Sequence, residues 1–462
     1  DHWAAGRVLG GGSSINMMLW VRGERSDFDG WRDAGCSGWG FDDVLPYFEK
    51  CESYADGPSP LRGTRGPIGV AKFAVPLEGV DDFMAAAEQA GHVRNPDYNG
   101  VSQQGVSEVQ VSQRRGMRSS TARAYLAPVR RRANLTIRTG AFVERVRIVD
   151  GRAVGVEFVV DGRTEVAEAA REVIVSTGSL ISPKLLMLSG IGPAIHLGEH
   201  GIEVKVDRPS VGSDLQEHAY GLMMVRTDAD TLVEEMKPLR ALRHGLAYLF
   251  RRRGALTVSG GAALVFARLT GEHPTESEII VMPAGMEFGR GEGGGTDHDV
   301  HRVKVLPHSM MVFPSFVHPK GRGTVRLASA DPAAAPAIDH ELVSEPDLRA
   351  LIDACRQART IIEAPAMAAK NAIEILPGAD VQTDEQWADY LRAVAFRPYH
   401  PVGTCRMGSD DDAVVDPQLR VRGVEGLRVV DASVFPSVTS GNTNAPVVMV
   451  AEKAADMILL GV

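Results

Sequence analysis

The chain has few cysteines and no long apolar run. Its 462 residues contain four cysteines, Cys36, Cys51, Cys355 and Cys405, and no two of them form a CxxC pair. So sparse a set excludes a disulfide scaffold and favours a reducing compartment, and we expect a cytoplasmic protein. A membrane-spanning helix needs about 20 consecutive apolar residues, and the sequence offers no such run, which predicts no membrane span. Histidines and cysteines do not cluster at metal-ligand spacing, so we predict no metal.

An excess of basic residues is missing as well. Lys and Arg number 50 against 59 for Asp and Glu, which gives a formal net charge of −9. This balance argues against a protein that binds nucleic acid or a membrane surface, and the basic run at 251–253 is interpreted as a solvated helix end. The apolar content of 44% and the charged content of 24% are typical of a globular protein, and the length predicts two or three domains.

The last part of the chain predicts a strand, a polar turn and a helix. Residues 427–431 are rich in β-branched residues and predict a short buried strand. A helical apolar pattern begins at Pro446, with Asn444 as its expected N-cap. The turn that carries Asn442 and Asn444 suits an anion, or a ring that becomes anionic, such as a flavin. Taken alone, ordinary helix capping explains this segment better.

Three consecutive glycines near the start cannot form a stable helix interior. Gly10, Gly11 and Gly12 are followed by Ser13 and Ser14 and stand between apolar residues. A backbone of this kind lies close against another group and offers free N–H groups to a phosphate. A flexible turn is the alternative, although the apolar residues on both sides make it less fitting.

Periodic patterns predict the remaining elements. A strand at 172–179 runs into a Gly/Ser turn and a helix at 182–188, an arrangement that nucleotide sites and purely structural βα corners share. Between about 207 and 386 the pattern becomes that of an α+β domain inserted into the first fold. The loop at 289–295 is interpreted as a surface loop. Further expected elements are a helix from about Asp42, a helix at 81–90, strands at 135–138, 143–148 and 154–160, a helix at 239–253, and strands at 278–282 and 310–316.

One histidine is framed by prolines. His400 stands between Pro398 and Pro401 in the stretch RPYHPVGTCRMG. Proline restricts the backbone, and such framing suits a base that must be held in one direction. Because a single histidine is more often structural or exposed than catalytic, this stretch leaves both interpretations open.

Four stretches, in this order, resemble motifs of the glucose-methanol-choline family of flavin oxidoreductases, and its choline-dehydrogenase-like members most of all. They are GRVLGGGSSIN, STGSLISPKLLMLSGIG, RPYHPVGTCRMG and GNTNAPVVMVAEKAADMI. The resemblance implies an α/β plus α+β fold. In it, a Rossmann-like FAD-binding domain with a parallel sheet and flanking helices is interleaved with a substrate-binding domain built on an antiparallel sheet. The first domain would comprise 1–40, 104–206 and 405–462, and the second 41–103 and 207–404.

The resemblance also assigns the site residues. His400 stands at the family's catalytic base, which accepts the alcohol proton while hydride passes to flavin N5. Asn442 stands at the second catalytic position, where it would hydrogen-bond the substrate oxygen. A base of this kind turns a hydroxyl towards an alkoxide, which makes hydride departure easier. The positions that match FAD-binding residues are Gly10, Gly11, Gly12, Ser13, Ser14, Asn16, Val143, Asp431, Ala432 and Asn444.

Two differences from the family pattern concern the cofactor. Some relatives carry, in the GGxSSxN loop, a histidine that bonds covalently to the flavin; Ile15 stands there, so we expect non-covalent FAD. The family pattern also starts with a βαβ unit of about 30 residues or more, whose GxGxxG turn holds the pyrophosphate. The sequence opens at Asp1 without that unit, an initiator Met or a signal-peptide pattern. We expect an N-terminal segment that is not represented, because FAD affinity should collapse without it.

The leading hypothesis is the FAD-dependent oxidation of an alcohol, expected to be primary, to an aldehyde. The expected partners are the alcohol and either oxygen or a quinone-like electron acceptor. One alternative is a non-redox flavoprotein of the hydroxynitrile lyase kind, and another is a flavin-free remnant; the pair of His400 and Asn442 favours the redox reaction. The sequence shows no cluster of aromatic residues with an acid, so choline itself is not predicted as the substrate.

Overall fold

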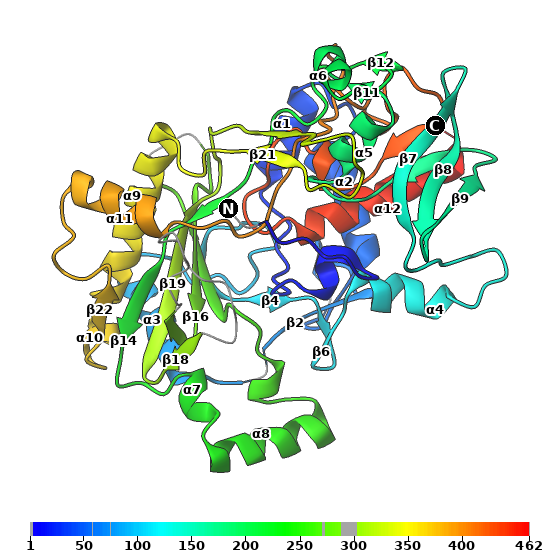
Figure 1. The fold of residues 1–462 in the computed structure, drawn as a ribbon. Coiled ribbons are helices and arrows are strands. Elements are labelled where there is room, and N and C mark those ends of the chain that lie inside the picture. The colour runs from blue at the N-terminus through cyan, green and yellow to red at the C-terminus, as the bar shows by residue number, and fades with distance from the viewer. Residues whose placement is uncertain (1–2, 58, 74, 270–272, 288–302, 462) are drawn as a thin grey trace.

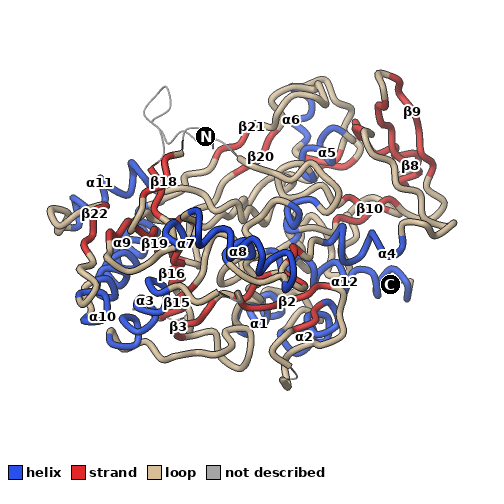
Figure 2. The backbone as a smooth tube through the Cα atoms, turned by 90° about the horizontal axis from the view of Figure 1, so that it is seen from below, coloured by secondary structure: helices blue, strands red, loops and turns tan. Residues whose placement is uncertain are grey.

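The protein is described by a computed structural model, which covers residues 3–57, 59–73, 75–269, 273–287 and 303–461. Its elements form two halves, one around a large antiparallel sheet and one around a parallel strand pair (Figure 1). The view from below separates the same two halves, with α3, α9 and α10 at one end and α2, α12 and β10 towards the other (Figure 2).

A seven-stranded antiparallel sheet forms the first half. Its order is β22-β14-β19-β16-β15-β3, and β13 pairs with the end of β19. The central strands β16 (Ser277–Met282) and β19 (Ser309–Phe316) are buried along almost their whole length, which is typical of strands covered on both faces. The other strands are β3 (Gly105–Glu108), β13 (Ala219–Tyr220), β14 (Met223–Arg226), β15 (Ala263–Ala267) and β22 (Ile373–Leu376).

The two faces of this sheet pack into different apolar clusters. Val265 points into a core that α3 (Glu78–Gln89), α9 (Glu345–Ile362) and α11 (Asp384–Val394) cover with their apolar faces. Its neighbour Phe266 belongs to a second cluster on the opposite face, because successive side chains of a strand alternate between faces.

The second half is built on a parallel strand pair. The strands β10 (Val173–Val175) and β23 (Leu427–Val429) pair in register from Val173 with Leu427. Helices α2 (Phe41–Cys51), α5 (Ser182–Leu188) and α12 (Asn444–Leu460) contribute to the surrounding core. Beside it lies an antiparallel meander of β7 (Phe142–Val149), β8 (Arg152–Val160) and β9 (Arg163–Glu168). The combination of a Rossmann-like half with a half based on an antiparallel sheet confirms the expected fold class.

Apart from α8, which has 14 residues, the remaining elements are short. They are η1 (Gly11–Ser14), α1 (Arg25–Asp33), β1 (Glu52–Tyr54), β2 (Ile68–Lys72), β4 (Gln110–Val111), β5 (Gln113–Arg114), β6 (Met117–Arg118), η2 (Ala122–Leu126), α4 (Ala127–Val129), β11 (Ile191–Gly192), α6 (Ala194–Glu199), β12 (Val206–Asp207), α7 (Leu232–Glu235), α8 (Pro238–Arg251), η3 (Ala255–Thr257), β17 (Gly285–Glu287), β18 (Lys304–Leu306), β20 (Thr324–Arg326), β21 (Ala337–Asp339), α10 (Pro365–Ala368) and η5 (Ala432–Val434). None of the described helices is long and apolar enough to cross a membrane.

Two expectations about local structure are wrong. Residues 135–138 form no strand, because no described strand lies beside them to accept their backbone hydrogen bonds. Asn444 is the first residue of α12 and not its N-cap; Thr443 takes the cap position without a side-chain hydrogen bond. The loop at 289–295 lies outside the described residues.

Candidate active site

His400 lies in a loop that is held on both sides. Its backbone N–H donates to the two carboxylate oxygens of Glu217 at 2.8 and 2.9 Å. The loop is also bridged to the segment that carries Glu217, before and after the histidine; the bridged pairs are Tyr220 with Phe396 and Gln216 with Val402. His400 is buried, with 8% of the residue exposed. Backbone contacts on both sides therefore fix the position of residue 400, whatever its side chain.

The two predicted catalytic residues, His400 and Asn442, lie in contact. Asn442 Nδ2 is 3.0 Å from His400 Nε2. Asn442 Oδ1 is buried, and no described residue hydrogen-bonds it. Gly441 brings the chain here with φ of 115°, and a Cβ at this position would lie 2.8 Å from a methyl carbon of Val21. A buried amide with one oxygen left over beside an imidazole fits a place where a ligand completes the hydrogen bonding.

His218 fixes which nitrogen of His400 carries hydrogen. His218 Nε2 lies 3.1 Å from the carbonyl oxygen of Val317, and a carbonyl only accepts, so this nitrogen is the one that carries hydrogen. The other nitrogen of neutral His218 is then an acceptor. It lies 3.1 Å from His400 Nδ1, which must therefore donate. His400 Nε2 therefore carries no hydrogen, and its lone pair accepts a hydrogen bond from Asn442 Nδ2 at 3.0 Å.

Burial keeps both imidazoles neutral. Desolvation lowers the pKa of His218 to about 4. Desolvation, helped by the neighbouring His218, lowers the pKa of His400 well below its usual value. Burial also raises the pKa of the Glu217 carboxyl to about 8, although backbone N–H donors oppose this shift. At neutral pH His400 is thus an unprotonated base.

A buried carboxylate lies on the side of the sheet that faces Asn442. Glu278, on β16, is fully buried; its Oε2 accepts the hydroxyl of Tyr220 at 2.9 Å, and its Oε1 has no partner among the described residues. Burial raises the pKa of this carboxyl to about 7. A Cβ built on Gly441 would lie 3.5 Å from Glu278 Oε1, which places the free oxygen next to the Asn442 turn.

Aromatic rings pack around Tyr220, the hydrogen-bond partner of this carboxylate. Tyr220 stacks at 6.4 Å on Phe313 and meets Phe396 edge-on at 5.8 Å, while Phe266 packs in the same apolar cluster. The sequence analysis missed this group. One signal was present, namely a charged residue inside the apolar stretch at 278–282, since a buried unpaired acid is rare without a function.

The glycine-rich loop is an ordered turn and not a flexible linker. Ser13 Oγ donates to the carbonyl of Gly10 at 2.6 Å, and Thr121 N–H donates to Ser13 Oγ at 3.0 Å. Arg118, at the end of β6, donates to Asn16 Oδ1 at 2.8 Å, so this second segment also holds the loop in place. The backbone N–H of Gly11 also donates to the carbonyl of Val8 at 2.8 Å, which fixes the turn further.

The other predicted cofactor residues lie at the corner after β23, on β7 and at the start of α12. Asp431 Oδ2 accepts the backbone N–H of Gly178 at 2.9 Å and the hydroxyl of Ser182 at 2.5 Å, so this side chain joins the corner after β10 to the corner after β23. Ala432 starts the turn η5, and Val143 lies on β7. Among the described residues, no hydrogen bond joins the side chain of Asn444 to the rest of the set.

Models of the GMC oxidoreductase family match residues 2–220 and 319–451. The chain belongs to the GMC oxidoreductase family. It is 42% identical over 461 residues to an oxygen-dependent choline dehydrogenase of Rhizobium etli, a match that spans 98% of this chain and 81% of the relative.

Solved GMC structures share the fold. Pyridoxine 4-oxidase from Mesorbium loti superposes with a TM-score of 0.85 at 29% identity, over 99% of this chain and 85% of that structure. A fungal aryl-alcohol oxidase superposes with a TM-score of 0.82 at 26% identity, over 99% and 86%. The family and these relatives support FAD-dependent oxidation of an alcohol as the activity of this GMC oxidoreductase, and they do not favour the lyase or the flavin-free remnant.

The GMC site residues fit the FAD that this family uses. A Cβ built on Gly11 or Gly12 meets nothing within 4 Å, and the same is true of Gly178, so the backbone is open at the points where a ligand would approach. The unpaired Asn442 Oδ1 supplies a further place for a partner. Free backbone N–H groups at turns of this kind hold phosphate.

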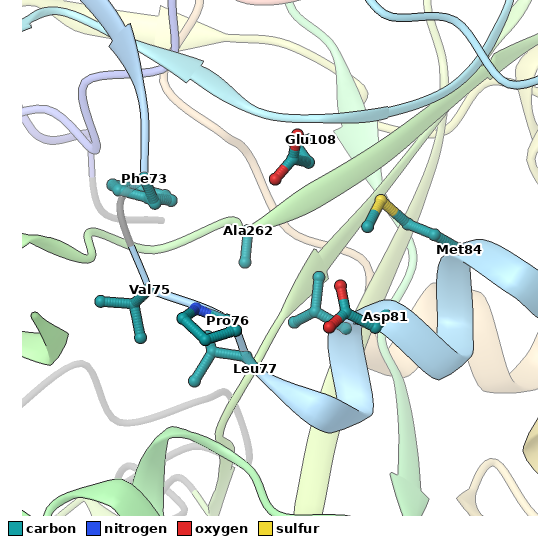
Figure 3. A pocket seen from close by; sticks show the side chains of 9 residues that line it. Phe73, Val75, Pro76, Leu77, Asp81, Met84, Glu108 and Ala262 are labelled. Carbon is teal, nitrogen blue, oxygen red and sulfur yellow. The ribbon is translucent and has the colours of Figure 1, made fainter.

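A separate cavity of about 300 Å³ lies beside α3 (Figure 3). Its lining includes Phe73, Leu77, Asp81, Met84 and Glu108. None of the predicted site residues is part of it. The cavity is therefore distinct from the place where His400 meets Asn442.

Proposed function

We propose that His400 is the base that takes the proton of the alcohol and that Asn442 holds the alcohol oxygen. The observation that carries this proposal is the 3.0 Å contact between Asn442 Nδ2 and the unprotonated Nε2 of His400. An alcohol that replaces this contact donates its O–H to His400 Nε2 and accepts a hydrogen bond from Asn442 Nδ2. As the proton moves to Nε2, the amide stabilises the negative charge that grows on the oxygen.

Bound FAD would supply the hydride acceptor, so that the carbinol carbon loses its hydrogen with two electrons and the oxygen loses its proton to His400. With a primary alcohol the product is an aldehyde. The residues proposed to hold FAD are those of the glycine-rich loop, Val143, Asp431, Ala432 and Asn444. Oxygen and a quinone-like carrier both remain as proposals for the final electron acceptor.

The proposed substrate is an alcohol that carries a positive charge, such as choline. The buried carboxylate of Glu278 with its unpaired oxygen supports this choice, since the positive charge of an ammonium group would pair with its negative charge. The rings of Tyr220, Phe313 and Phe396 support it too, because aromatic faces attract quaternary ammonium groups. Relatives named oxygen-dependent choline dehydrogenases agree with this proposal. This proposal replaces the expectation from the sequence, in which no cluster of aromatic residues with an acid was visible and choline was not predicted as the substrate.

We also propose a division into an FAD-binding domain of 1–40, 104–206 and 405–462 and a substrate-binding domain of 41–103 and 207–404. The separate apolar cores support it for 405–462 and for most of 207–404, whereas α2 (Phe41–Cys51) packs in the core of the FAD-binding half and β3 (Gly105–Glu108) pairs in the antiparallel sheet. A reducing compartment is supported by the four cysteines, which are free and buried.

The decisive experiment is an anaerobic absorbance spectrum of the purified flavoprotein before and after choline is added. Loss of the yellow colour on addition, with an aldehyde as product, would support the proposal. A flavin that stays oxidised with choline and with a broad panel of other alcohols would contradict it. The rate of recolouring in air then separates oxygen from another acceptor.

The attachment of FAD gives a prediction that needs no substrate. Ile15 stands in the loop at the position where some relatives carry a flavin-bound histidine, and an isoleucine side chain has no nucleophile. Precipitating the protein with trichloroacetic acid is therefore expected to release all of the yellow colour into the supernatant. Flavin that stays with the pellet would show a covalent bond to another residue.

Replacement of His218 is expected to slow the reaction, because its Nδ1 holds the imidazole of His400 in place through Nδ1–H. In a His218→Leu variant the Nδ1–H of His400 loses its partner, and a buried unpaired donor costs about 1–3 kcal/mol. We expect kcat to fall about tenfold, with little change in KM. The acid limb of the pH profile should move to higher pH, because His218 helps to lower the pKa of His400.

His218→Gln is the matched control for this variant. Its amide oxygen can accept from His400 Nδ1, so most of the activity should return. Equal loss in both variants, with an unmoved acid limb, would mean that His218 only fills space.

A further inference from the structure

Helix α8 presents an apolar face to solvent. The helix runs along the lower rim of the molecule in Figure 1, beside α7. Five large apolar side chains recur at helical spacing on its outer side, and nothing described packs on them. Their exposed fractions are 87% for Leu239, 63% for Leu242, 48% for Leu246, 64% for Leu249 and 78% for Phe250. An exposed apolar stripe this long is unusual on a globular protein and marks an interaction surface.

The inner side of the same helix is firmly attached. His244 is buried there; its Nε2 lies 2.7 Å from a carboxylate oxygen of Glu235 on α7, and its Nδ1 accepts the N–H of Ala255 at 3.2 Å. These polar contacts fix the inner side of α8 against the protein, so its apolar side faces the solvent.

The segment that carries this face is strongly basic. Residues 236–256 contain no Asp or Glu, whereas the whole chain has a net charge of −9. Their basic residues are Lys237, Arg240, Arg243, Arg251, Arg252 and Arg253. Of these, Arg240 is neutralised by Asp230 and Glu235. The others lie at the two ends of the apolar face or beside it, and they are exposed.

We propose that this face of α8 docks the protein on an anionic membrane surface. An apolar stripe with cationic edges is the composition of helices that lie in the headgroup region of a bilayer. A second copy of this chain fits less well, because a two-fold contact places the same patch on itself and would bring the arginines of both copies together. Lipid phosphates supply the opposite charge, and the acyl boundary accepts the leucines and Phe250.

This proposal corrects the inference drawn from net charge. The value of −9 argued against a membrane-surface protein, but it is a sum over the whole molecule. Interactions between charges are screened beyond about 10 Å at 0.1 M salt, so a lipid surface responds to the charges of α8 and not to acids elsewhere. The run at 251–253 is then an edge of the docking face in addition to a helix end.

Vesicle co-sedimentation of the FAD-loaded enzyme tests the proposal. Binding is expected with vesicles of phosphatidylcholine mixed with phosphatidylglycerol, and it should weaken strongly with pure phosphatidylcholine or with added salt. The double variant Leu246→Ser and Leu249→Ser is expected to bind about a hundredfold more weakly, since each leucine contributes roughly a factor of ten when buried. Removing charge with Arg251→Gln and Arg253→Gln should weaken binding to the mixed vesicles only.

Two control substitutions remove exposed apolar groups elsewhere. Val101→Ser and Ile195→Ser change side chains that are 94% and 83% exposed, and they should leave vesicle binding intact. Surface substitutions of this kind rarely unfold a protein, and turnover with a soluble dye should be unchanged in all variants. Absence of vesicle binding would overturn the proposal. So would a concentration-dependent dimer, seen by analytical ultracentrifugation, that the leucine substitutions abolish while vesicle binding is unaffected.

Discussion

Replacement of His400 by alanine is expected to lower kcat by a factor on the order of 10²–10⁴, the range that a positioned base contributes. The reason is that, among the described residues, no other base is in contact with the Asn442 side chain, as His400 Nε2 is. The loop should survive the change, because the backbone N–H of residue 400 donates to Glu217 whatever the side chain. Turnover of choline at saturation measures the effect.

The flavin spectrum separates loss of chemistry from loss of structure. The His400→Ala variant should bind as much FAD as the unchanged protein, and strong base in the medium should restore part of the rate. His200→Ala, at the end of α6, is the matched control and should keep full activity. Full activity in His400→Ala would remove His400 from the mechanism.

The second large effect is expected at Glu278. Gln keeps the shape and the acceptor for Tyr220 but removes the negative charge, so Glu278→Gln should lower kcat/KM for choline about a hundredfold. That corresponds to about 3 kcal/mol, within the range for removing one member of a buried charge pair. The uncharged tert-butyl analogue of choline should lose little. Equal losses for both alcohols would contradict a role in recognising the cation.

The pH dependence provides a further check on Glu278. Burial raises the pKa of its carboxyl to about 7, so the carboxyl is neutral below that pH and negative above it. For choline, kcat/KM should rise about tenfold per pH unit towards pH 7 and then level off. His400 adds its own acid limb at a lower pH, because its pKa lies well below the usual value. In Glu278→Gln only the lower limb should remain.

Elements with strong local signals were predicted well from the sequence. The helix expected at 182–188 is α5 (Ser182–Leu188), and the strands expected at 143–148 and 154–160 lie inside β7 and β8. Residues 135–138 have a strand-like pattern but no strand beside them, so they stay irregular. A strand is stable only through its partner, and partner choice is not a local property.

The candidate site likewise combines residues that could be predicted from the sequence with one that could not. His400 and Asn442 were predicted because each lies in a short stretch whose residues resemble a family motif. Glu278 was not predicted, because its neighbours in space come from other parts of the chain. Tyr220, which hydrogen-bonds it, is 58 positions away in sequence, and His218 and His400 are 182 positions apart.

The sequence by itself determined the family, the reaction and the pair His400 and Asn442, because each of these depends on short stretches of consecutive residues. Only the tertiary structure decided the tautomer of His400, the buried acid beside aromatic rings and the outward apolar face of α8. Each of these depends on which distant segments share a face of the sheet and on which side of a helix stays uncovered. Burial then sets the charge of His400 and Glu278, since the cost of ionisation follows from the surroundings of a group in space.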